Sequence, residues 1–393
     1  MVQSCPEASA TKWHQAHTTW FFETFVLRPF LSDYRPFLEQ FHRLFNSYYI
    51  GLGLGILEKR PRGIFSRPSL EQVVEFRLYV DREIERLCAN LCEAEVTWRI
   101  ILGLNHEQQH QELLLTDIKH AFYSNPLRPS YRTPRIPNES HPRVPALRWL
   151  SFVGGLTEIG NPVDSDRYTN FCFDNETPRH LVYLQPFQIA NRLVTCREYL
   201  EFVCDDGYTR PSLWLSDGWE TAERGKWEAP LYWERDSADA LGWRVFTLRG
   251  SHGLSDLLDT PVCHLSFYEA DAFARWRSCR LPTEEEWEFV ARQSPANGNL
   301  LDTDRLHPSV AISDGLTQIF GDCWEWTASA YTGYPGYKPQ PGLLGEYSGK
   351  FMSGQSILRG GSCVTPGGLV RTTYRNFFPP ATRWQFTGIR LAT

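Results

Sequence analysis

Hydrophobic residues in the first third of the chain recur at intervals of three and four, a spacing that aligns them on one face of an α-helix. The longest series runs from Val73 to Leu91. Prolines interrupt the pattern at four places, which divides the segment into shorter helices. Residues 1–124 are therefore predicted to form a domain of four main helices packed as a bundle.

Two of these helices have recognisable limits. Ser69 followed by Gln72 resembles a capping box, which predicts a helix from there to about Cys92. A further helix is predicted over 94–123, because its apolar positions keep the helical spacing throughout.

The pattern changes after residue 124. Residues 125–146 hold six prolines and almost no hydrophobic periodicity, which is typical of a linker or an extended strap. Over 147–393, short apolar runs alternate with Gly, Asp and Pro turns, and helical spacing returns near 195–205 and 266–278. The predicted fold class is α+β, with a mixed second domain after the bundle.

Composition narrows the classes of function. The net charge of −6 and the lack of a basic stripe argue against a nucleic-acid partner. The first residues do not have the charged and apolar regions of a secretory signal, and no stretch approaches the roughly 18 apolar residues of a membrane span. The ten cysteines are scattered without a Cys-x-x-Cys pair, which is typical of a reduced, cytoplasmic protein.

One predicted helix carries a candidate metal site. His106 and His110 are four residues apart, so both project from the same helix face and can reach one metal ion. Imidazole suits Fe, Zn, Cu or Ni. Two alternatives compete: a zinc protease, since His106-Glu107-x-x-His110 matches its motif, and two surface histidines. The spacing that follows does not supply the third ligand of a zinc protease, and Leu104 and Leu113 suggest that this face turns inward.

A third ligand is sought in the other histidine-rich helical segment. His17 shares its neighbourhood with Trp13, Trp20 and Phe21, so it is expected to point into the bundle. His14 is the alternative, although it lies nearer the start of the helix.

Longer segments of the chain resemble a known family. In the first domain they are WHQAHTTWFFETF (13–25), FNSYY (45–49) and NHEQQHQELLL (105–115). In the second they are PVCHLSFYEADAFARW (261–276), RLPTEEEWE (280–288), GDCWEWT (321–327), RGGS (359–362) and GIRLA (388–392). Together they resemble the ergothioneine-biosynthetic sulfoxide synthases over nearly the whole chain.

The resemblance implies a fold, a cofactor and a reaction. The fold would be a DinB-like four-helix bundle (1–124) followed by a domain like the formylglycine-generating enzyme (147–393). His17, His106 and His110 would hold Fe(2+). With O2, the iron would join a thiol, either cysteine or γ-glutamylcysteine, to the imidazole C2 of hercynine (Nα-trimethylhistidine), giving a sulfoxide. Three neutral imidazoles leave open positions on iron, which is compatible with this chemistry.

One departure separates the chain from the formylglycine-generating branch. That branch uses cysteines near its C-terminus for copper and thiol chemistry. Residues 371–393 contain no cysteine, so this activity is not expected here.

The resemblance also suggests residues around the iron. Gln109 would hydrogen-bond the substrate imidazole, unless it is a core glutamine. Tyr48 or Tyr49 would supply a proton or an electron that steers the reaction away from oxidation of the bare thiol. Adjacent helical residues point about 100° apart, so at most one of the two is expected to face the iron. Both could instead be packing residues.

Hercynine carries a permanent cation, which aromatic faces attract. Phe377 and Phe378, which follow Asn376, and the nearby Trp384 are the candidates for its pocket, with core packing as the alternative. Arg60 and Arg62 lie in a proline-bounded loop and could bind the carboxylate of the thiol substrate, or could simply be solvated.

Other functions remain open at this stage. The same scaffold could attach sulfur at a different imidazole carbon or transfer selenium. A non-catalytic metal-binding module is the third possibility. The sequence decides neither the thiol nor the oligomeric state.

Overall fold

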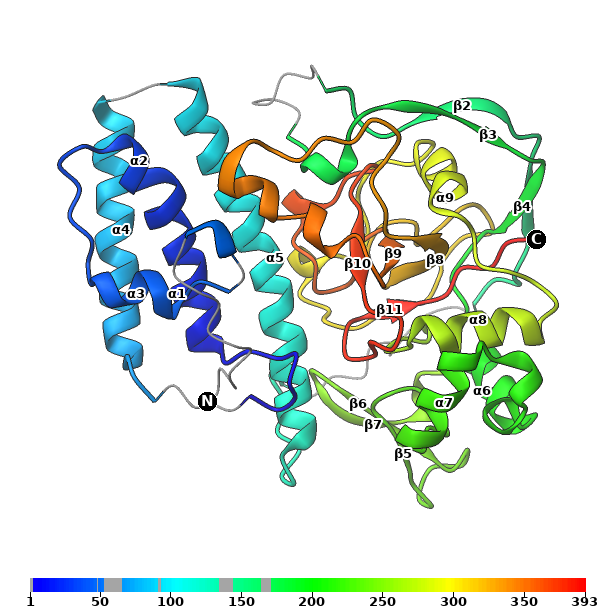
Figure 1. Cartoon of the computed structure of the whole chain (residues 1–393). Helices are drawn as coiled ribbons and strands as arrows, with labels where there is room; N and C mark the ends of the chain where they lie inside the picture. Colours follow the sequence, from blue (N-terminus) through cyan, green and yellow to red (C-terminus); the bar gives the residue numbers. More distant parts are fainter. Residues whose placement is uncertain (1–2, 48, 53–65, 91–92, 134–143, 164–170) are drawn as a thin grey trace.

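The protein is described by a computed structural model that covers residues 3–47, 49–52, 66–90, 93–133, 144–163 and 171–393. The regular elements described in the N-terminal bundle are all helical (Figure 1). Its elements are α1 (Thr11–Phe22), the π-helical turn η1 (Glu23–Leu27), α2 (Arg28–Phe30), α3 (Glu39–Leu44), α4 (Leu70–Asn90) and α5 (Ala94–Ser124).

The bundle differs from the predicted one in the lengths of its helices. The segment from α1 through η1 to α2 is continuous, and α4 and α5 are long, but α3 has only 6 residues. Pro36 lies in the irregular segment that separates α2 from α3 and cannot donate a backbone hydrogen bond. Three long helical segments and one short helix therefore form the bundle, and the π-helical turn is a feature that the hydrophobic spacing did not reveal.

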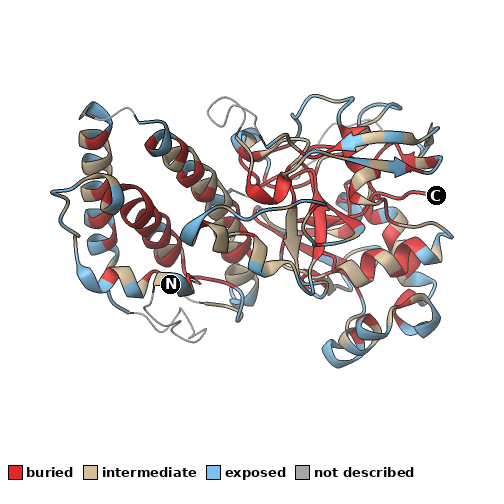
Figure 2. Ribbon diagram, turned by 45° about the horizontal axis from the view of Figure 1, so that its top comes forward, coloured by how far each residue is buried: buried red, intermediate tan, exposed pale blue. Residues whose placement is uncertain are grey.

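The predicted cap of α4 is confirmed. The backbone N–H of Ser69 donates to Gln72 Oε1 at 2.9 Å, and the N–H of Gln72 donates to Ser69 Oγ at 3.3 Å. The first helix lies at the centre of the bundle, between α4 and α5, and nine of its 12 residues are buried. Figure 2 shows this burial.

The C-terminal domain, from β1 onward, is a mixed structure of short strands and helices (Figure 1). Its largest sheet has the order β10–β9–β8–β11, in which only β11 and β8 are parallel. Smaller antiparallel sheets pair β1 with β4, β2 with β3, and β5 with β6 and β7. The strands are β1 (Trp149–Phe152), β2 (Gly155–Ile159), β3 (His180–Leu184), β4 (Phe187–Ala190), β5 (Trp233–Arg235), β6 (Trp243–Thr247), β7 (Gly250–Gly253), β8 (Trp324–Ala330), β9 (Ser356–Arg359), β10 (Asn376–Phe378) and β11 (Thr387–Gly388).

Three of the helices described in this domain begin at capping boxes. The helices are α6 (Cys196–Cys204), α7 (Ser216–Gly225), α8 (Phe267–Trp276) and α9 (Glu284–Ala291). A Thr or Ser caps α6, α8 and α9, and a Glu three residues later returns the bond. Of the four, α6 and α8 match predicted helical stretches.

Helix α5 joins the two parts of the molecule, because its residues contact both (Figure 1). Gln109 Nε2 donates to the Tyr374 hydroxyl at 2.7 Å, and the Trp324 indole N–H donates to Glu112. The helix that carries two of the predicted metal ligands is thus fixed against the C-terminal domain. None of the described helices combines the length and apolar character needed to cross a membrane.

Candidate metal centre

The three predicted metal ligands meet inside the bundle. His17 from α1 and His106 and His110 from α5 each offer a ligand atom, and these atoms all lie within 4.8 Å of one another. Among the described residues, this is the one group of three or more His, Cys, Asp or Glu with that convergence. The α1–α5 packing brings them together, since α1 contributes one ligand and successive turns of α5 contribute the other two.

A backbone carbonyl fixes the tautomer of His17. Its Nδ1 lies 2.7 Å from the carbonyl oxygen of Phe45, which can only accept, so Nδ1 carries the proton. Nε2 is then the nitrogen with the lone pair that a metal binds. The His17 ring also stacks on the rings of Trp13 and Trp20, with centroid distances of 4.5 and 5.4 Å, and these contacts fix its orientation.

A carboxylate fixes the tautomer of His110 through a second histidine. Asp117 Oδ2 accepts from Nε2 of His14 at 3.0 Å, so in the neutral His14 ring Nδ1 is an acceptor. Nδ1 of His110 lies 2.8 Å from that atom and must donate to it. The lone pair of His110 is therefore on Nε2. His14, which the sequence offered as the alternative third ligand, instead hydrogen-bonds to His110 and orients its ring.

His106 is the third member and is the least constrained by hydrogen bonds. It is 3% exposed, and its Nδ1 is buried with no hydrogen-bond partner among the described residues. Burial lowers the pKa of His106 to about 3, so the ring is neutral, which is the form that binds metals. A buried imidazole nitrogen without a partner, beside two oriented imidazoles, fits a bound metal ion.

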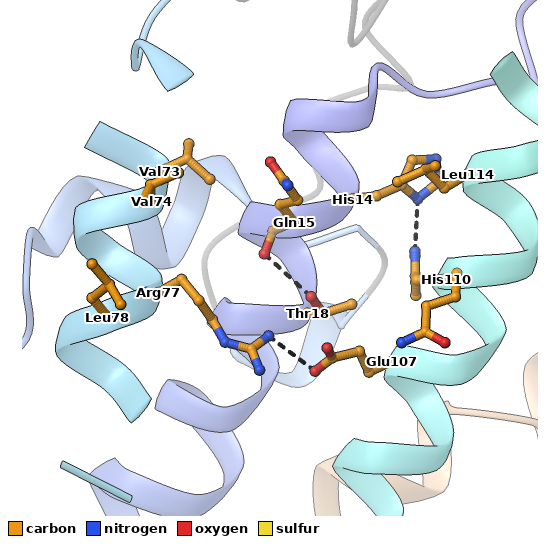
Figure 3. A pocket seen from close by; sticks show the side chains of 11 residues that line it. His14, Gln15, Thr18, Val73, Val74, Arg77, Leu78, Glu107, His110 and Leu114 are labelled. Carbon is orange, nitrogen blue, oxygen red and sulfur yellow. Dashed lines mark hydrogen bonds and ion pairs between the residues drawn. The ribbon is translucent and has the colours of Figure 1, made fainter. Parts of the chain in front are cut away.

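Glu107 does not take part in this centre. Its Oε2 accepts from Arg77 of α4 at 2.9 Å, and both side chains line a cavity of about 260 Å³ between α1, α4 and α5 (Figure 3). A zinc protease of the His-Glu-x-x-His type needs this carboxylate as a general base next to the metal. The ion pair with Arg77 therefore argues against that alternative.

The cavity borders the centre from the bundle side. His14 and His110 lie on its wall, together with Gln15, Thr18, Gln111 and Leu114 and the α4 residues Val73, Val74 and Leu78 (Figure 3). Gln109, by contrast, contacts the C-terminal domain. The histidines thus lie between this cavity and the junction of the two domains.

At the junction, two tyrosines hold Gln109. Tyr374 accepts from its Nε2 at 2.7 Å, and Tyr347 donates to its Oε1. The ring of Tyr347 also meets His106 edge to face, with centroids 5.7 Å apart. Burial raises the pKa of Tyr374, so its phenol keeps its proton at neutral pH. Sequence reasoning did not single out Tyr347, because it lies 238 positions from Gln109 and matches no motif.

The predicted tyrosine pair is only partly described. Tyr48 lies outside the described residues. Tyr49 is 1% exposed and packs in the bundle core against Phe25, at 4.9 Å, and Trp20, at 5.6 Å. Because Trp20 also stacks on His17, the Trp20 ring lies between Tyr49 and that histidine.

The aromatic candidates near the C-terminus contact two different groups. The ring of Phe377 stacks on Tyr331, with centroids 3.9 Å apart, whereas the ring of its neighbour Phe378 lies 6.1 Å from that of Trp384. Successive side chains of a strand point to opposite faces, which accounts for the separation. The indole N–H of Trp384 donates to Asp117 at 3.2 Å, which connects it to the histidine network. Asn376 is half-buried and accepts from the backbone N–H of Phe377 at 2.9 Å.

The arginines predicted to bind the thiol substrate, Arg60 and Arg62, fall outside the described residues. Arg67, at the end of the same loop, is exposed.

Comparison with known proteins defines the class. Residues 137–310 and 309–393 match the family described as the sulfatase-modifying factor enzyme 1-like domain. The fold and site therefore define a histidine-bearing helical bundle joined to a domain of this family.

The relatives define the family more narrowly. The chain is 32% identical to a hercynine oxygenase of Mycobacterium tuberculosis, over 74% of this chain and 70% of the relative. It is 31% identical to a hercynine oxygenase of Mycolicibacterium smegmatis, over 77% and 73%. It is also 26% identical to ergothioneine biosynthesis protein 1 of Schizosaccharomyces pombe, over 83% of this chain and 44% of that protein. The chain belongs to the hercynine oxygenase family, which confirms the resemblance to the ergothioneine-biosynthetic sulfoxide synthases.

Proposed function

We propose that this protein is a non-haem iron(II) enzyme of ergothioneine biosynthesis. It would use O2 to join the imidazole C2 of hercynine to the sulfur of cysteine or γ-glutamylcysteine, giving a sulfoxide. The observation that carries the proposal is the oriented histidine centre beside Gln109, in a chain of the hercynine oxygenase family.

His17, His106 and His110 would hold the iron. A ferrous ion with three imidazole ligands supplies open coordination positions and one-electron chemistry with dioxygen. The described residues add no carboxylate to this group of ligand atoms, so those positions would be left to the reactants. The role of the chain is then to keep the three imidazoles neutral and oriented, through Phe45 and through His14 and Asp117.

Gln109 would position hercynine. Its amide nitrogen has two hydrogens, and Tyr374 accepts one of them. The second is available for a nitrogen of the substrate imidazole. Because Tyr347 and Tyr374 hold both ends of the amide, its orientation is set before substrate binds, which lowers the entropic cost of binding.

Aromatic side chains would receive the trimethylammonium group of hercynine. We assign this role to Phe377, Phe378 and Trp384, with Asn376 beside them. The structure places Phe378 and Trp384 in one aromatic pair and Phe377 in another, so the Phe378–Trp384 pair is the better candidate, since it adjoins the histidine network through Asp117. Arg60 and Arg62 stay proposed partners of the carboxylate of the thiol substrate.

A phenol would direct the outcome of the reaction by providing a proton. Tyr48 and Tyr49 are one pair of candidates, and Tyr374 is another, since it keeps its proton and touches Gln109. Without such a donor, oxidation of the thiol alone to a sulfinic acid should compete with C–S bond formation.

The test is iron loading without oxygen, followed by oxygen uptake and mass spectrometry with hercynine and each thiol. We expect uptake and a hercynine-derived sulfoxide with one of the two thiols. Binding of iron without oxygen uptake would favour a non-catalytic metal-binding module, and a product joined at another imidazole carbon would indicate different regiochemistry.

Single phenylalanine variants at the three tyrosine positions then locate the proton donor. The variant that removes it should bind iron normally and shift the product from sulfoxide to sulfinic acid, as measured by NMR. If Tyr48→Phe, Tyr49→Phe and Tyr374→Phe all keep the parental ratio, no phenol of this set is the donor.

A further inference from the structure

A buried lysine lies on α5, nine residues beyond His110. Lys119 is 1% exposed, and its Nζ lies 2.7 Å from Nε2 of His264. The rings of Tyr232 and Phe386 lie 4.7 and 4.6 Å from Nζ. No carboxylate in the described part of the chain forms an ion pair with this lysine. A buried ammonium group is costly unless an anion lies near it.

Three cysteine thiols act electrostatically on Lys119. Burial lowers the pKa of Lys119 to about 8, and the charges of Cys263, Cys323 and Cys363 act in the opposite direction. The three cysteines belong to one buried cluster, although they come from distant parts of the chain. They are therefore the groups best placed to carry the negative charge that the lysine needs.

Two of these cysteines contact each other. The sulfurs of Cys323 and Cys263 are within hydrogen-bond reach of each other, and the Cys323 thiol donates at 3.9 Å to the carbonyl oxygen of Val262, the residue before Cys263. Burial raises the pKa of the Cys263 thiol, but this hydrogen bond and the charges of His264 and Lys119 hold that pKa well below its usual value. The two sulfurs are thus adjacent, and Cys263 is the member of the pair whose thiolate form is favoured.

We propose that Cys263 and Cys323 form an oxidisable dithiol that closes to a disulfide when a hydroperoxide is the oxidant, with Lys119 as the cation that activates Cys263. The thiolate form of cysteine is the nucleophile in such reactions, and a second thiol in contact resolves the first oxidation product. Nothing in the proposed hercynine chemistry requires these two residues.

The reaction balances with hydrogen peroxide as the hydroperoxide. The Cys263 sulfur attacks one peroxide oxygen, so that an S–O bond forms, the O–O bond breaks, and hydroxide leaves and takes up a proton to become water. The Cys323 sulfur then attacks the Cys263 sulfur. The S–S bond forms, the S–O bond breaks, and a second water leaves with the proton of Cys323. The two thiols together lose two electrons, which reduce one peroxide.

Metal binding is the competing interpretation of a cluster of cysteines and histidines. The ammonium group of Lys119 lies 4.6 Å from the ring of Phe386, which belongs to the same buried cluster as the cysteines, so a metal cation in that cluster would lie close to another positive charge. The ligand atoms also do not converge, since the group of three within 4.8 Å in the described residues is the histidine centre alone. Both observations favour thiol chemistry.

Peptide mapping of the full-length protein tests the proposal. The protein is treated with hydrogen peroxide, quenched with catalase, alkylated under denaturing conditions and analysed by mass spectrometry. We expect a peptide pair linked through Cys263 and Cys323 in most molecules. The exposed Cys88 and Cys204 provide the reactivity reference in the same sample. If they are oxidised while Cys263 and Cys323 stay fully alkylated, the proposal is wrong.

Serine variants identify the roles within the cluster. Cys323→Ser should leave Cys263 as a sulfenic acid that dimedone traps, and Cys263→Ser should leave Cys323 reduced. Cys363→Ser is the matched control, because it removes a thiol of the same cluster and should not change the linked pair. A disulfide that includes Cys363 in the parent protein would contradict the assignment. This outcome is measured on the parent protein, so it does not depend on whether a variant folds.

Two further measurements separate the alternatives. Lys119→Met should raise the pKa of the Cys263 thiol and so reduce its thiolate fraction. Disulfide formation should then slow about tenfold for each unit by which that pKa increases. An unchanged rate in a folded variant would exclude the activating role of the lysine. Metal analysis of the Cys263→Ser, Cys323→Ser double variant should match the parent, and loss of a bound metal would favour the metal-site interpretation instead.

Discussion

The N-terminal bundle and the C-terminal domain bury polar side chains in different ways. In the C-terminal domain, two fully buried arginines pair with fully buried carboxylates, Arg390 with Glu325 and Arg359 with Glu288. In the bundle, the buried polar group at the centre is a set of imidazoles whose lone pairs converge. The first arrangement is complete within the chain, whereas the second would be completed by the metal ion of the proposed function.

This difference suggests that the C-terminal domain and the bundle centre have different roles. The paired charges and capped helices of the C-terminal domain set its structure without a ligand. Helix α5, which carries Gln109 and two histidines, is fixed against that domain and against α1. Substitutions in the C-terminal domain should therefore mainly change the free energy of unfolding, and those in the bundle centre should mainly change metal binding.

The largest effect is expected at Glu325. Its carboxylate accepts from Arg390 at 2.8 Å and from the Trp287 indole at 2.9 Å. Glu325→Gln leaves a buried guanidinium without its anion, which should lower the free energy of unfolding by about 3–5 kcal/mol in urea titration. The control is Arg197→Met at an exposed pair with Asp259, for which less than about 1 kcal/mol is expected. Equal losses would show that burial does not distinguish these pairs.

The metal should have the next largest effect, confined to the bundle. Fe(II) added without oxygen at about one hundred times its dissociation constant should raise the free energy of unfolding by about 3 kcal/mol. His106→Ala should remove this increase, because one ligand of the converging set is lost. His42→Ala, in the same bundle but outside the set, should keep it. Stabilisation that survives in His106→Ala would place the metal elsewhere.

One buried carboxyl group of the C-terminal domain forms no ion pair with any residue that the structure describes, and it should therefore respond to pH. Burial raises the pKa of Asp322 to about 6, although Asn299 and the Ser309 N–H donate to it. Between about pH 4 and 6 the folded protein holds a proton that the unfolded chain releases, so the stabilisation is present at the acidic end and is lost as pH rises. A shift of this size corresponds to about 2–3 kcal/mol.

The difference between the parent and Asp322→Asn isolates this group from other carboxyls. Urea titrations at several pH values should show a smaller decline in stability for the variant across the window. Parallel curves for the two proteins would mean that Asp322 does not titrate there.

Much of the architecture followed from local patterns. Helical spacing and a capping box located α4 and α5, and the four-residue interval placed His106 and His110 on one face. The apolar neighbours of His17 predicted that it points into the bundle, and its ring lies with those of His106 and His110, whereas His14 hydrogen-bonds to His110. These features depend on residues close together in the sequence, whose relative positions a helix determines.

Long-range partners could not be predicted in this way. Tyr347 binds Gln109 across 238 positions, and Trp384 reaches Asp117 across 267. Asp117 carries no motif, and its role became visible only through its contact with His14. Such contacts depend on how the two domains dock, which no periodicity in either one encodes.

The smallest effect is expected from Trp384→Phe, which tests how closely the two regions are linked. The indole N–H donates to Asp117 at 3.2 Å, and Asp117 in turn orients His14, which contacts the ligand His110. Phenylalanine keeps an aromatic ring beside Phe378 but removes the donor. Since Asp117 still accepts from His14, a loss of about 1 kcal/mol is expected, equivalent to a few-fold weaker Fe(II) affinity in anaerobic titration. Fe(II) affinity equal to that of the parent, together with weaker hercynine binding, would assign the ring to the substrate pocket and not to the hydrogen-bond network. Weaker affinity for iron with unchanged hercynine binding would show that the C-terminal domain acts on the metal centre through this one contact.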